Sequence, residues 1–593
     1  MAGKNQVASL TSALHPDDAS SWVVRLWDNF HMQRRGKIDE WKELRNYIFA
    51  TDTSTTSNQS LPWKNSTTIP KLCQIRDNLH SNYISALFPN DSWMRWEAAD
   101  QDSATKQKAE TIQAYLDNKT RMGHFQTEMS KLLYDYIDYG NAIATVTYEA
   151  NSHELNGELI PEYVGPRVYR ISPMDIVFNP LASSFQESFK IVRSIRTLGD
   201  LAKLAKSAPG QEYWNKVLED RRHFRGIMGG YSIEDFDKYE GFQVDGFGNM
   251  YEYYMSDYVE ILEFYGDYFD VNTMELKENV HLVVADRRCI LKEEPIPNWF
   301  GTSPFFHVGW RFRTDNLWAM GPLDNLVGMQ YRIDHLENLK ADAMDLAVHP
   351  MLVIQGDVED FDYEPGGRIY IDDVGQSNVT ELGKNLNGVV SANNEIAQLE
   401  QRMEMYAGAP REAMGIRSPG EKTAFEVQQL QNAGGRIFQE KITNFEIEMV
   451  EPVLNSMLET ARRNMDGMDV IRVFDDELGA QFFQSITKQD ITASGRIRPV
   501  GARHFAKQAQ DLQNLMGVFA NPQVVQMIAP HTSAIALTSF IEDVTGLQAY
   551  DIFQPNVAIS EQQETQRQAS QAQEDLQVEQ SVGTQGAPSG AVQ

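Results

Sequence analysis

The sequence predicts an α+β fold, and three observations support that class. Apolar residues recur at steps of three and four before Gly140, period-two alternation follows it, and long helical patterns return after Gly321. At 593 residues the chain exceeds one compact core, so several subdomains are expected. A hydrophobic content of 42% and an aromatic content of 10% are ordinary for a folded protein.

The first 321 residues predict a mixed body that follows a small, polar N-terminal arm at 1–17. Helical spacing begins at residue 18, and Trp22, Trp27 and Trp41 are expected in the core or in subunit contacts. Further helices are predicted over 69–88 and 104–139. Strands are predicted at 142–148, 167–171, 175–178, from 191 onward before a short helix, at 258–265 and at 280–293.

The most informative stretch is 311–449, and within it we call residues 322–410 the stalk. Gly321-Pro322 predicts a helix start and His349-Pro350 its end, because proline fits the first helical position and restricts the residue before it. A second helix is predicted over 391–410. Asp334 and other acids are expected on the faces of the first helix that its apolar residues do not occupy. The residues expected to pack the two helices are Leu326, Met329, Ile333, Leu336, Ile396, Leu399 and Met403.

Between the two helices lies a small acidic module, 350–390, with short strands predicted at 351–354 and 368–371. Its charged side chains include Asp357, Glu359, Asp360, Asp362 and Glu364, with Arg368 as one of few cations. A module this thin does not bury a core by itself. We therefore expect it to need neighbouring subunits.

The region after the stalk begins with a loop, 411–417, and continues as a mixed segment over 418–500. Ser418-Pro419-Gly420-Glu421 is a capping box that predicts a helix start, and Gly434-Gly435 predicts a kink in that helix. Strands are predicted at 471–474 and 491–497. Two helices are expected within 501–559, and the Gln-rich tail, 560–593, is predicted to be disordered.

The charge and the cysteines narrow the functional classes. A formal charge of −30 argues against tight wrapping of nucleic acid, which needs a basic surface, but is compatible with DNA that slides past an acidic wall. Only Cys73 and Cys289 are present, which indicates a reducing compartment. The start lacks an apolar signal core and no run approaches 18 apolar residues, so no membrane association is expected.

Two patterns resemble catalytic sites, and each has a simpler interpretation. Residues 415–423 resemble a phosphate-binding loop, but Glu421 is inserted before Lys422 and the capping box explains the segment. The pairs Asp372-Asp373 and Asp475-Asp476 could hold a nuclease metal, although adjacent acids in so acidic a chain are usually a solvated face. We therefore predict that the chain is not an enzyme and uses no cofactor or metal.

Three cations surround the loop that follows the stalk. Arg411, Arg417 and Lys422 could touch a passing phosphate backbone if this loop faces a lumen. They could instead pair with Glu412 and Glu421 or with a neighbouring subunit. Both interpretations remain open from the sequence.

The order of body, long helix, small module, second helix, loop and kinked helix resembles the portal protein, or head–tail connector, of tailed bacteriophages, especially short-tailed ones. Three local phrases carry the same resemblance: Tyr169 to Pro180, Ala319-Met320-Gly321-Pro322, and Lys422 to Val427. The family often has Asp before the last proline of the first phrase. This chain has Asn179 there, so no carboxylate role is carried over.

The resemblance implies a portal architecture. Residues 18–321 and 418–500 would form the α/β wing, 322–349 and 391–410 the two-helix stem, 350–390 the β-containing clip, 411–417 the tunnel loop, and 501–559 the helical crown. A ring, commonly of twelve copies, would occupy the capsid vertex of a virion assembled in the host cytoplasm. Double-stranded DNA would pass through it non-specifically. The implied partners are the terminase large subunit, tail adaptor proteins and the major capsid protein.

Two other classes of protein fit this order of elements less well. A non-portal head–tail protein, such as an adaptor or scaffold, would usually be shorter and would lack the helix–module–helix order. A packaging ATPase or a nuclease would require an intact phosphate loop or an acidic metal cluster, and Glu421 and the scattered acids argue against both.

Overall fold

The computed structural model describes residues 19–49, 67–88, 93–98, 103–155, 158–204, 215–219, 258–270, 274–287, 289–297, 303–348, 352–355, 378–381, 387–408, 437–465, 467–475 and 480–499. All of them belong to the first of two units, Met1–Ala502; the second is Arg503–Gln593. The predicted N-terminal arm, crown and tail therefore lie outside the described residues. The described residues combine helices and strands, as an α+β class requires.

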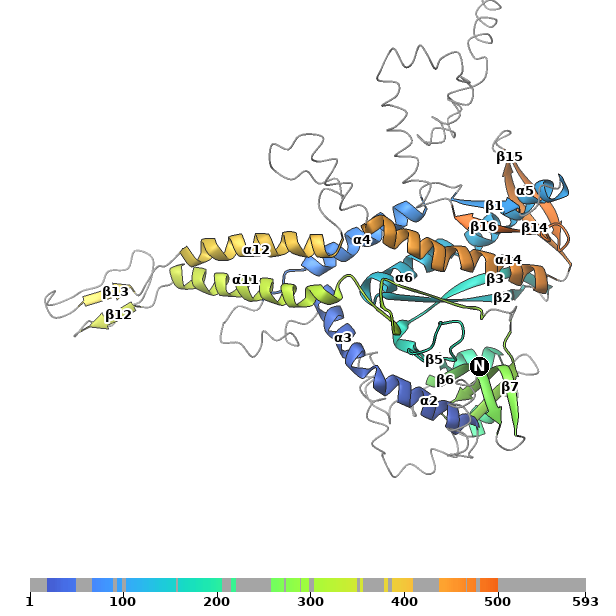
Figure 1. Ribbon diagram of the computed structural model, residues 1–593, viewed down its shortest axis with the longest axis horizontal. Helices are drawn as coiled ribbons and strands as arrows, with labels where there is room; N and C mark the ends of the chain where they lie inside the picture. The colour runs from blue at the N-terminus through green and yellow to red at the C-terminus, as the bar shows by residue number, and fades with distance from the viewer. Residues whose placement is uncertain are drawn as a thin grey trace, which may run out of the picture. The chain divides into compact units, whose positions relative to one another are not determined.

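The N-terminal part of the first unit is largely helical (Figure 1). Its helices are α2 (Ala19–Gln33), α3 (Arg35–Phe49), α4 (Lys71–Leu87), α5 (Ser103–Met122) and α6 (Phe125–Asp138). Trp22, Trp27 and Trp41 are buried, which confirms that they belong to the core. One continuous helix was predicted over 104–139, but the structure has two helices there, α5 and α6. The chain breaks between α5 and α6 because His124 adopts a left-handed φ of 55°.

Two larger antiparallel sheets follow. The first has the order β3-β2-β9 and consists of β2 (Asn141–Leu155), β3 (Glu158–Ile171) and β9 (Phe305–Gly309). The second is a meander of β4 (Ile176–Phe178), β5 (Lys190–Thr197), β6 (Tyr258–Asp270), β7 (Glu275–Ala285) and β8 (Cys289–Pro295). A short helix, α7 (Leu198–Leu204), follows β5 as predicted. Trp22 and Trp27 of α2 pack on the meander beside Phe264.

The strand predicted over 280–293 is two strands, β7 and β8. Asp286 and Arg287 between them have left-handed φ values of 47° and 63°, which turn the chain back on itself. Residues of other elements also stabilise this turn. The Asp286 N–H donates to Glu260 O over 2.8 Å, and the Arg287 guanidinium contacts Glu260 and Asp28.

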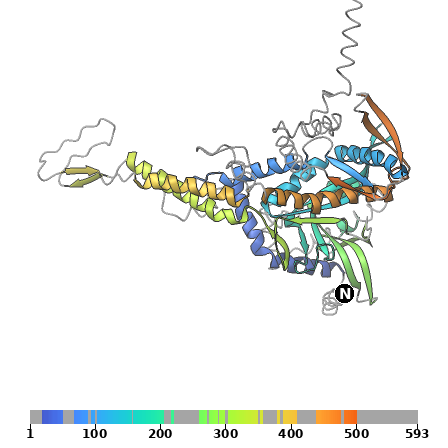
Figure 2. The same cartoon turned by 45° about the horizontal axis from the view of Figure 1, so that its top comes forward.

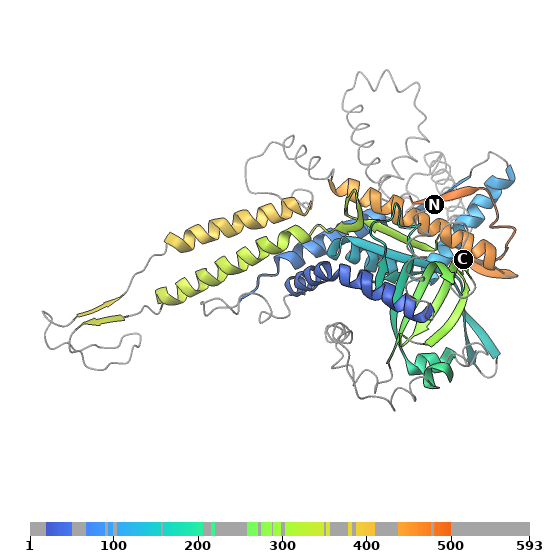
Figure 3. The same ribbon diagram turned by 60° about the horizontal axis from the view of Figure 1, so that its bottom comes forward.

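The stalk runs from η3 (Asp324–Leu326) through α11 (Val327–Val348), β12 (Leu352–Gln355) and β13 (Asn378–Glu381) to α12 (Asn387–Tyr406). A short antiparallel ribbon, β10 (Arg311–Arg313) with β11 (Asn316–Met320), precedes it. The helices α11 and α12 lie side by side in Figures 1, 2 and 3, and β12 pairs antiparallel with β13 beyond their far ends.

The stalk helices differ in their bounds from those predicted. A 3-10 turn replaces the expected start at Pro322, because the Asp324 carboxylate accepts the Gly321 N–H over 3.1 Å and the Lys37 ammonium over 2.7 Å. The second helix begins at Asn387 and ends at Tyr406, earlier at both ends than the predicted 391–410. The strand predicted at 368–371 lies outside the described residues.

The C-terminal part of the first unit returns to the body. The helix from 437 onward contains a π-turn, η4 (Glu446–Val450), and continues as α14 (Glu451–Asn464). Pro452 is the second residue after the π-turn and lacks the N–H that an α-helical turn would use. The kink predicted at 434–435 lies outside the described residues. Strands β14 (Met468–Asp475), β15 (Ala480–Thr487) and β16 (Gly495–Pro499) complete the unit.

The strand predicted over 491–497 is correct only at its end. Residues 491–494 precede β16, and Arg462 of α14 holds this stretch by donating to Ile491 O and Ala493 O, each over 2.8 Å. Strand β16 pairs antiparallel with β1 (Met94–Ala98). The parts of the body before and after the stalk therefore share a hydrogen-bonded ribbon.

Candidate functional site

The stalk packs onto the largest hydrophobic cluster of the first unit. Ile333 and Leu336 of α11 and Ile396 and Met403 of α12 are buried in that cluster, as is Leu326 of η3. Met329 and Leu399 are partly buried against it. All seven predicted stem-packing residues thus contact one core within the chain. Their contribution to contacts between copies stays a prediction.

A row of polar side chains attaches α11 to the segment that precedes α4. Gln330, Asp334 and Asn338 stand four residues apart, so they share one helix face, and all three are buried. Asn338 Oδ1 accepts the Thr67 N–H over 2.8 Å, and Asp334 Oδ1 accepts the Ile69 N–H over 2.9 Å. Gln330 Nε2 donates to Ile69 O over 2.5 Å. The side chains of a helix thereby satisfy the backbone of an extended segment.

Asp334, which the sequence places outside the apolar stripe of its helix, is nevertheless buried. An acid on a helix is usually solvated, but here the Ile69 N–H and Gln330 Nε2 both donate to Oδ1 and make burial tolerable. The spacing of Gln330, Asp334 and Asn338 was visible in the sequence. Three amide or carboxyl residues in one i, i+4, i+8 row are the pattern that could have revealed this contact.

Asp334 keeps one unsatisfied atom. Its Oδ2 is buried and has no hydrogen-bond partner among the described residues. Burial raises the pKa of Asp334 from 3.8 to about 6, while the hydrogen bonds from Ile69 and Gln330 oppose that rise. The ionised carboxylate at the base of the stalk therefore lowers the stability of the folded chain near neutral pH.

Ion pairs connect the second stalk helix to the body and to the first stalk helix. Lys71 at the start of α4 reaches Glu404 near the end of α12, and both side chains are buried. Arg332 of α11 and Glu395 of α12 form a second, exposed pair at 3.1 Å. The buried pair fixes α12 against the body, whereas the exposed pair contributes at most about 1 kcal/mol.

Apolar side chains are exposed along the part of the stalk toward the β12–β13 hairpin. The exposed fractions are 41% for Leu339, 45% for Met344 and 65% for Val348 on α11, and 59% for Val390 on α12. Met344 and Val348 stand four residues apart and so share one face of α11, where exposed apolar side chains indicate a contact surface. We call these four residues the stalk apolar patch.

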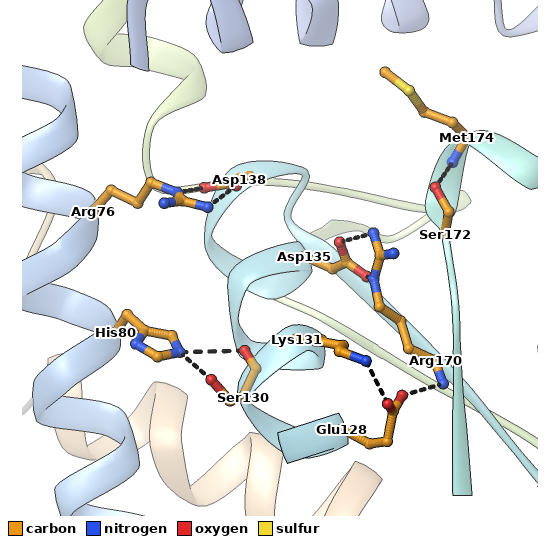
Figure 4. A network of polar contacts seen from close by, with 10 residues as sticks. All are labelled: Arg76, His80, Glu128, Ser130, Lys131, Asp135, Asp138, Arg170, Ser172 and Met174. Carbon is orange, nitrogen blue, oxygen red and sulfur yellow. Dashed lines mark hydrogen bonds and ion pairs between the residues drawn. The ribbon is translucent and has the colours of Figure 1, made fainter. Parts of the chain in front are cut away.

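The body that carries the stalk is held by charged pairs around α6 (Figure 4). Asp138 accepts two hydrogen bonds from Arg76 of α4, at 2.6 and 2.9 Å. Asp135 accepts two from Arg170 of β3, at 2.5 and 2.7 Å. Burial outweighs the guanidinium of Arg170 and raises the pKa of Asp135 to about 7. Two bidentate pairs therefore fix α6 between α4 and β3.

The segment 169–180 is held in position by a buried arginine and by its own polar side chains. Arg34 donates to Pro173 O and Ile176 O, each over 2.7 Å, and to Met174 O over 3.0 Å. Asp175 pairs with Arg193 at 2.6 Å. Asn179 Oδ1 accepts the Leu181 N–H, so this amide closes a local turn.

The junction before the stalk depends on two glycines and one asparagine. Gly140 has a φ of +69°, and a Cβ placed there would lie 2.3 Å from Gly321 N. Buried Asn141 donates to Tyr139 O and Ala319 O and accepts from the Ala319 N–H. Gly321, expected only as a helix-start signal, also eases this close backbone approach, because a Cβ there would lie 3.1 Å from Gly140 N and from Ile137 O.

The remaining predicted site residues lie outside the described part of the chain. These are the tunnel-loop cations Arg411, Arg417 and Lys422 and the docking residues Asp357, Glu359, Asp360, Asp362, Glu364 and Arg368. Of the clip, the structure describes the paired strands β12 and β13. The roles of the tunnel-loop and clip residues stay predictions.

Within the described ranges, no three or more His, Cys, Asp or Glu side chains are grouped so that they could bind a metal ion. None of the helices described is both long and apolar enough to cross a membrane. Comparison with protein-family models gives no match to this chain, and comparison with curated proteins gives none either.

Proposed function

We propose that this chain is a ring-forming portal protein that provides the channel for packaging and ejection of a viral genome. In this proposal, α11 and α12 are the stem, the β12–β13 hairpin belongs to the clip, and the rest of the first unit is the wing. The chain acts as a structural conduit and not as an enzyme. Terminase and tail adaptors would dock on the clip, and DNA would pass through the channel.

The stalk is the observation that supports this proposal most strongly. Two packed helices joined by a small hairpin extend from an α+β body, with their base fixed by Gln330, Asp334 and the Lys71–Glu404 pair. The stalk apolar patch is exposed in the single chain. A closed heterologous ring would cover such a patch with the next copy.

The pairing of β1 with β16 gives separate support. Residues before and after the stalk form one body, so the stalk is an insertion into that body and not a linker between two domains. An inserted stalk has both its ends anchored at one place. That arrangement suits a rigid subunit of a ring.

Negative-stain microscopy with native mass measurement tests the proposal. Rings with a central hole are expected, and a dodecamer of this 67.4 kDa chain has a mass of about 809 kDa. Portals can require scaffold or capsid proteins to assemble, so the measurement is repeated in their presence. A chain that stays monomeric under both conditions and hydrolyses ATP would overturn the proposal in favour of a motor.

A further inference from the structure

The β1–β16 ribbon has one buried face and one charged face. The register pairs Arg95 with Arg498, Trp96 with Ile497 and Glu97 with Arg496. Trp96 and Ile497 are buried, whereas the side chains of the other two pairs are exposed. Because side chains alternate along strands, Arg95, Arg496, Arg498 and Glu97 share the outer face. We call these four residues the arginine face.

The body holds this ribbon rigidly. The Asn455 side chain of α14 donates to Ile497 O and accepts the Ile497 N–H, both at 3.0 Å. The Arg462 guanidinium lies 5.6 Å from the Trp96 ring centroid. A Cβ on Gly495 would lie 2.4 Å from the Trp96 ring, so the glycine permits this close packing. The arginine face is therefore presented on a fixed support.

The charges on this face do not balance each other. Three arginines surround one carboxylate, in a chain whose formal charge is −30. Arg498 pairs with Glu97 at 3.0 Å, and both side chains are about half exposed. Arg95 stands directly opposite Arg498, although like charges in directly opposed positions destabilise a strand pair. Three arginines and one glutamate leave an excess of two positive charges on this face, which favours an anionic partner.

We infer that the arginine face binds the phosphate backbone of double-stranded DNA. The choice of DNA as the polyanion rests on the proposed function. Guanidinium groups match phosphate oxygens with two parallel hydrogen bonds. Arg496 and Arg498 are separated by about 6.6 Å along their strand. Two guanidinium groups are thereby presented side by side to a phosphate backbone.

A protein partner fits this face less well. The exposed side chains of β1 and β16 that the structure describes are all charged: Arg95, Glu97, Arg496 and Arg498. Protein interfaces depend on buried aromatic and apolar anchors surrounded by a polar rim. A purely charged face lacks such an anchor, whereas phosphate binding requires only the charge. The contact would be independent of base sequence.

Fluorescence anisotropy of a random-sequence duplex of about 30 base pairs, titrated with the full-length chain from about 50 to 200 mM salt, tests this inference. The variant R95Q/R498Q should bind at least about tenfold more weakly at the lowest salt, and its salt slope should fall by roughly 2. Glu97→Gln should bind more tightly than the wild type, because it removes the carboxylate from the face.

The matched control is R311Q/R313Q, which removes two exposed arginines from the β10–β11 ribbon and leaves the same net charge as R95Q/R498Q. It should bind DNA as the wild type does. If both double variants weaken DNA binding equally, the loss of binding would follow from the change in net charge alone, and the inference would be overturned. Competition by poly-L-glutamate is the second control. If poly-L-glutamate binds as tightly as DNA and its binding also depends on Arg95 and Arg498, the face would be a site for an acidic protein and the inference would be overturned.

The same variants separate this inference from the proposed function. Microscopy of the wild type tests ring formation, and anisotropy tests the arginine face. Rings combined with DNA binding that R95Q/R498Q leaves unchanged would reject the inference alone. DNA binding that depends on the arginine face, in a chain that never forms rings, would reject the portal assignment alone. Melting temperatures of all variants verify that each is folded.

Discussion

Lys71 Nζ lies 2.7 Å from Glu404 Oε1, and each of the two side chains is only 5% exposed. The two residues are 333 positions apart and connect the start of α4 with the end of α12. A second bond from Lys71 to Gln74 Oε1, at 3.0 Å, helps to satisfy the ammonium. The second stalk helix is thereby attached to the body through a desolvated charge pair.

Removing one partner of this pair should destabilise the chain far more than removing both. Lys71→Met or Glu404→Leu leaves a buried charge without its counter-ion and should cost about 3–5 kcal/mol. The double variant K71M/E404L should recover most of that loss. Thermal unfolding of the four proteins of the cycle measures the coupling. Additive losses would show that the pair contributes no interaction energy.

Asp334→Asn should stabilise the chain at pH 8. The folded-state pKa of Asp334 is raised from 3.8 to about 6, so the folded state binds the proton more tightly. The stability gained from that proton is complete below about pH 3.8 and is lost as the pH rises through about 6. Ionised Asp334 therefore costs up to about 3 kcal/mol at pH 8.

The gain from Asp334→Asn should fall by roughly half at pH 5, because folded Asp334 is then mostly protonated. Melting curves of the wild type and the variant at pH 5 and pH 8 provide the comparison. Asn338→Asp is the matched control, since it adds a buried carboxylate to the same row and should destabilise more at pH 8 than at pH 5. A pH-independent difference for Asp334→Asn would contradict the assigned pKa.

Gly140→Ala should disturb the junction before the stalk. The new Cβ would lie 2.3 Å from Gly321 N, and the left-handed φ of +69° disfavours any L side chain. The expected loss is at least about 2 kcal/mol. Gly328→Ala is the control, because its Cβ would meet no atom within 4 Å and a helical alanine should stabilise by about 0.5–1 kcal/mol.

Charged substitutions in the stalk apolar patch should prevent ring assembly without unfolding the chain. Met344→Glu and Val348→Glu alter side chains that are exposed in the single chain, so the melting temperature of the monomer should change little. Native mass should shift from rings to monomers. Leu181→Glu, at a body position that is 76% exposed, is the control and should still form rings. Rings formed by the stalk variants would exclude the patch from the interface.

Removal of residues 560–593 should leave ring formation intact, because their composition favours a segment that is not part of a packed core. Microscopy of the truncated chain next to the full-length chain checks this expectation. The absence of rings in the truncated chain alone would assign the tail a role in assembly.

Local patterns predicted the elements of this fold well where the interactions were local. Apolar spacing in α11 and the proline after His349 gave a helix close to the observed one, and the alternation after Gly140 gave β2. The predicted element boundaries were wrong where one or two residues determine them through a hydrogen bond or an unusual backbone conformation. Asp324 delays the stalk helix, and the left-handed Asp286 and Arg287 divide one predicted strand into two.

The contacts that position the stalk could not be predicted, because they join distant residues. Nothing near Asp334 in the sequence indicates that the Ile69 N–H would reach it. The partner of Lys71 lies on another helix, and local sequence does not specify it. Of the candidate site, the sequence predicted the packing residues of the stalk, but not the polar row that orients it.

The β1–β16 ribbon also governs when the body can be completed during synthesis. Its strands are separated by almost 400 residues, so at about 5–20 residues per second β1 waits roughly 20–80 s for β16 to leave the ribosome. Until then Trp96 lacks its cross-strand neighbour Ile497. A nascent chain that already displays a finished stalk therefore still has an unfinished body, because β16 follows the stalk in the sequence.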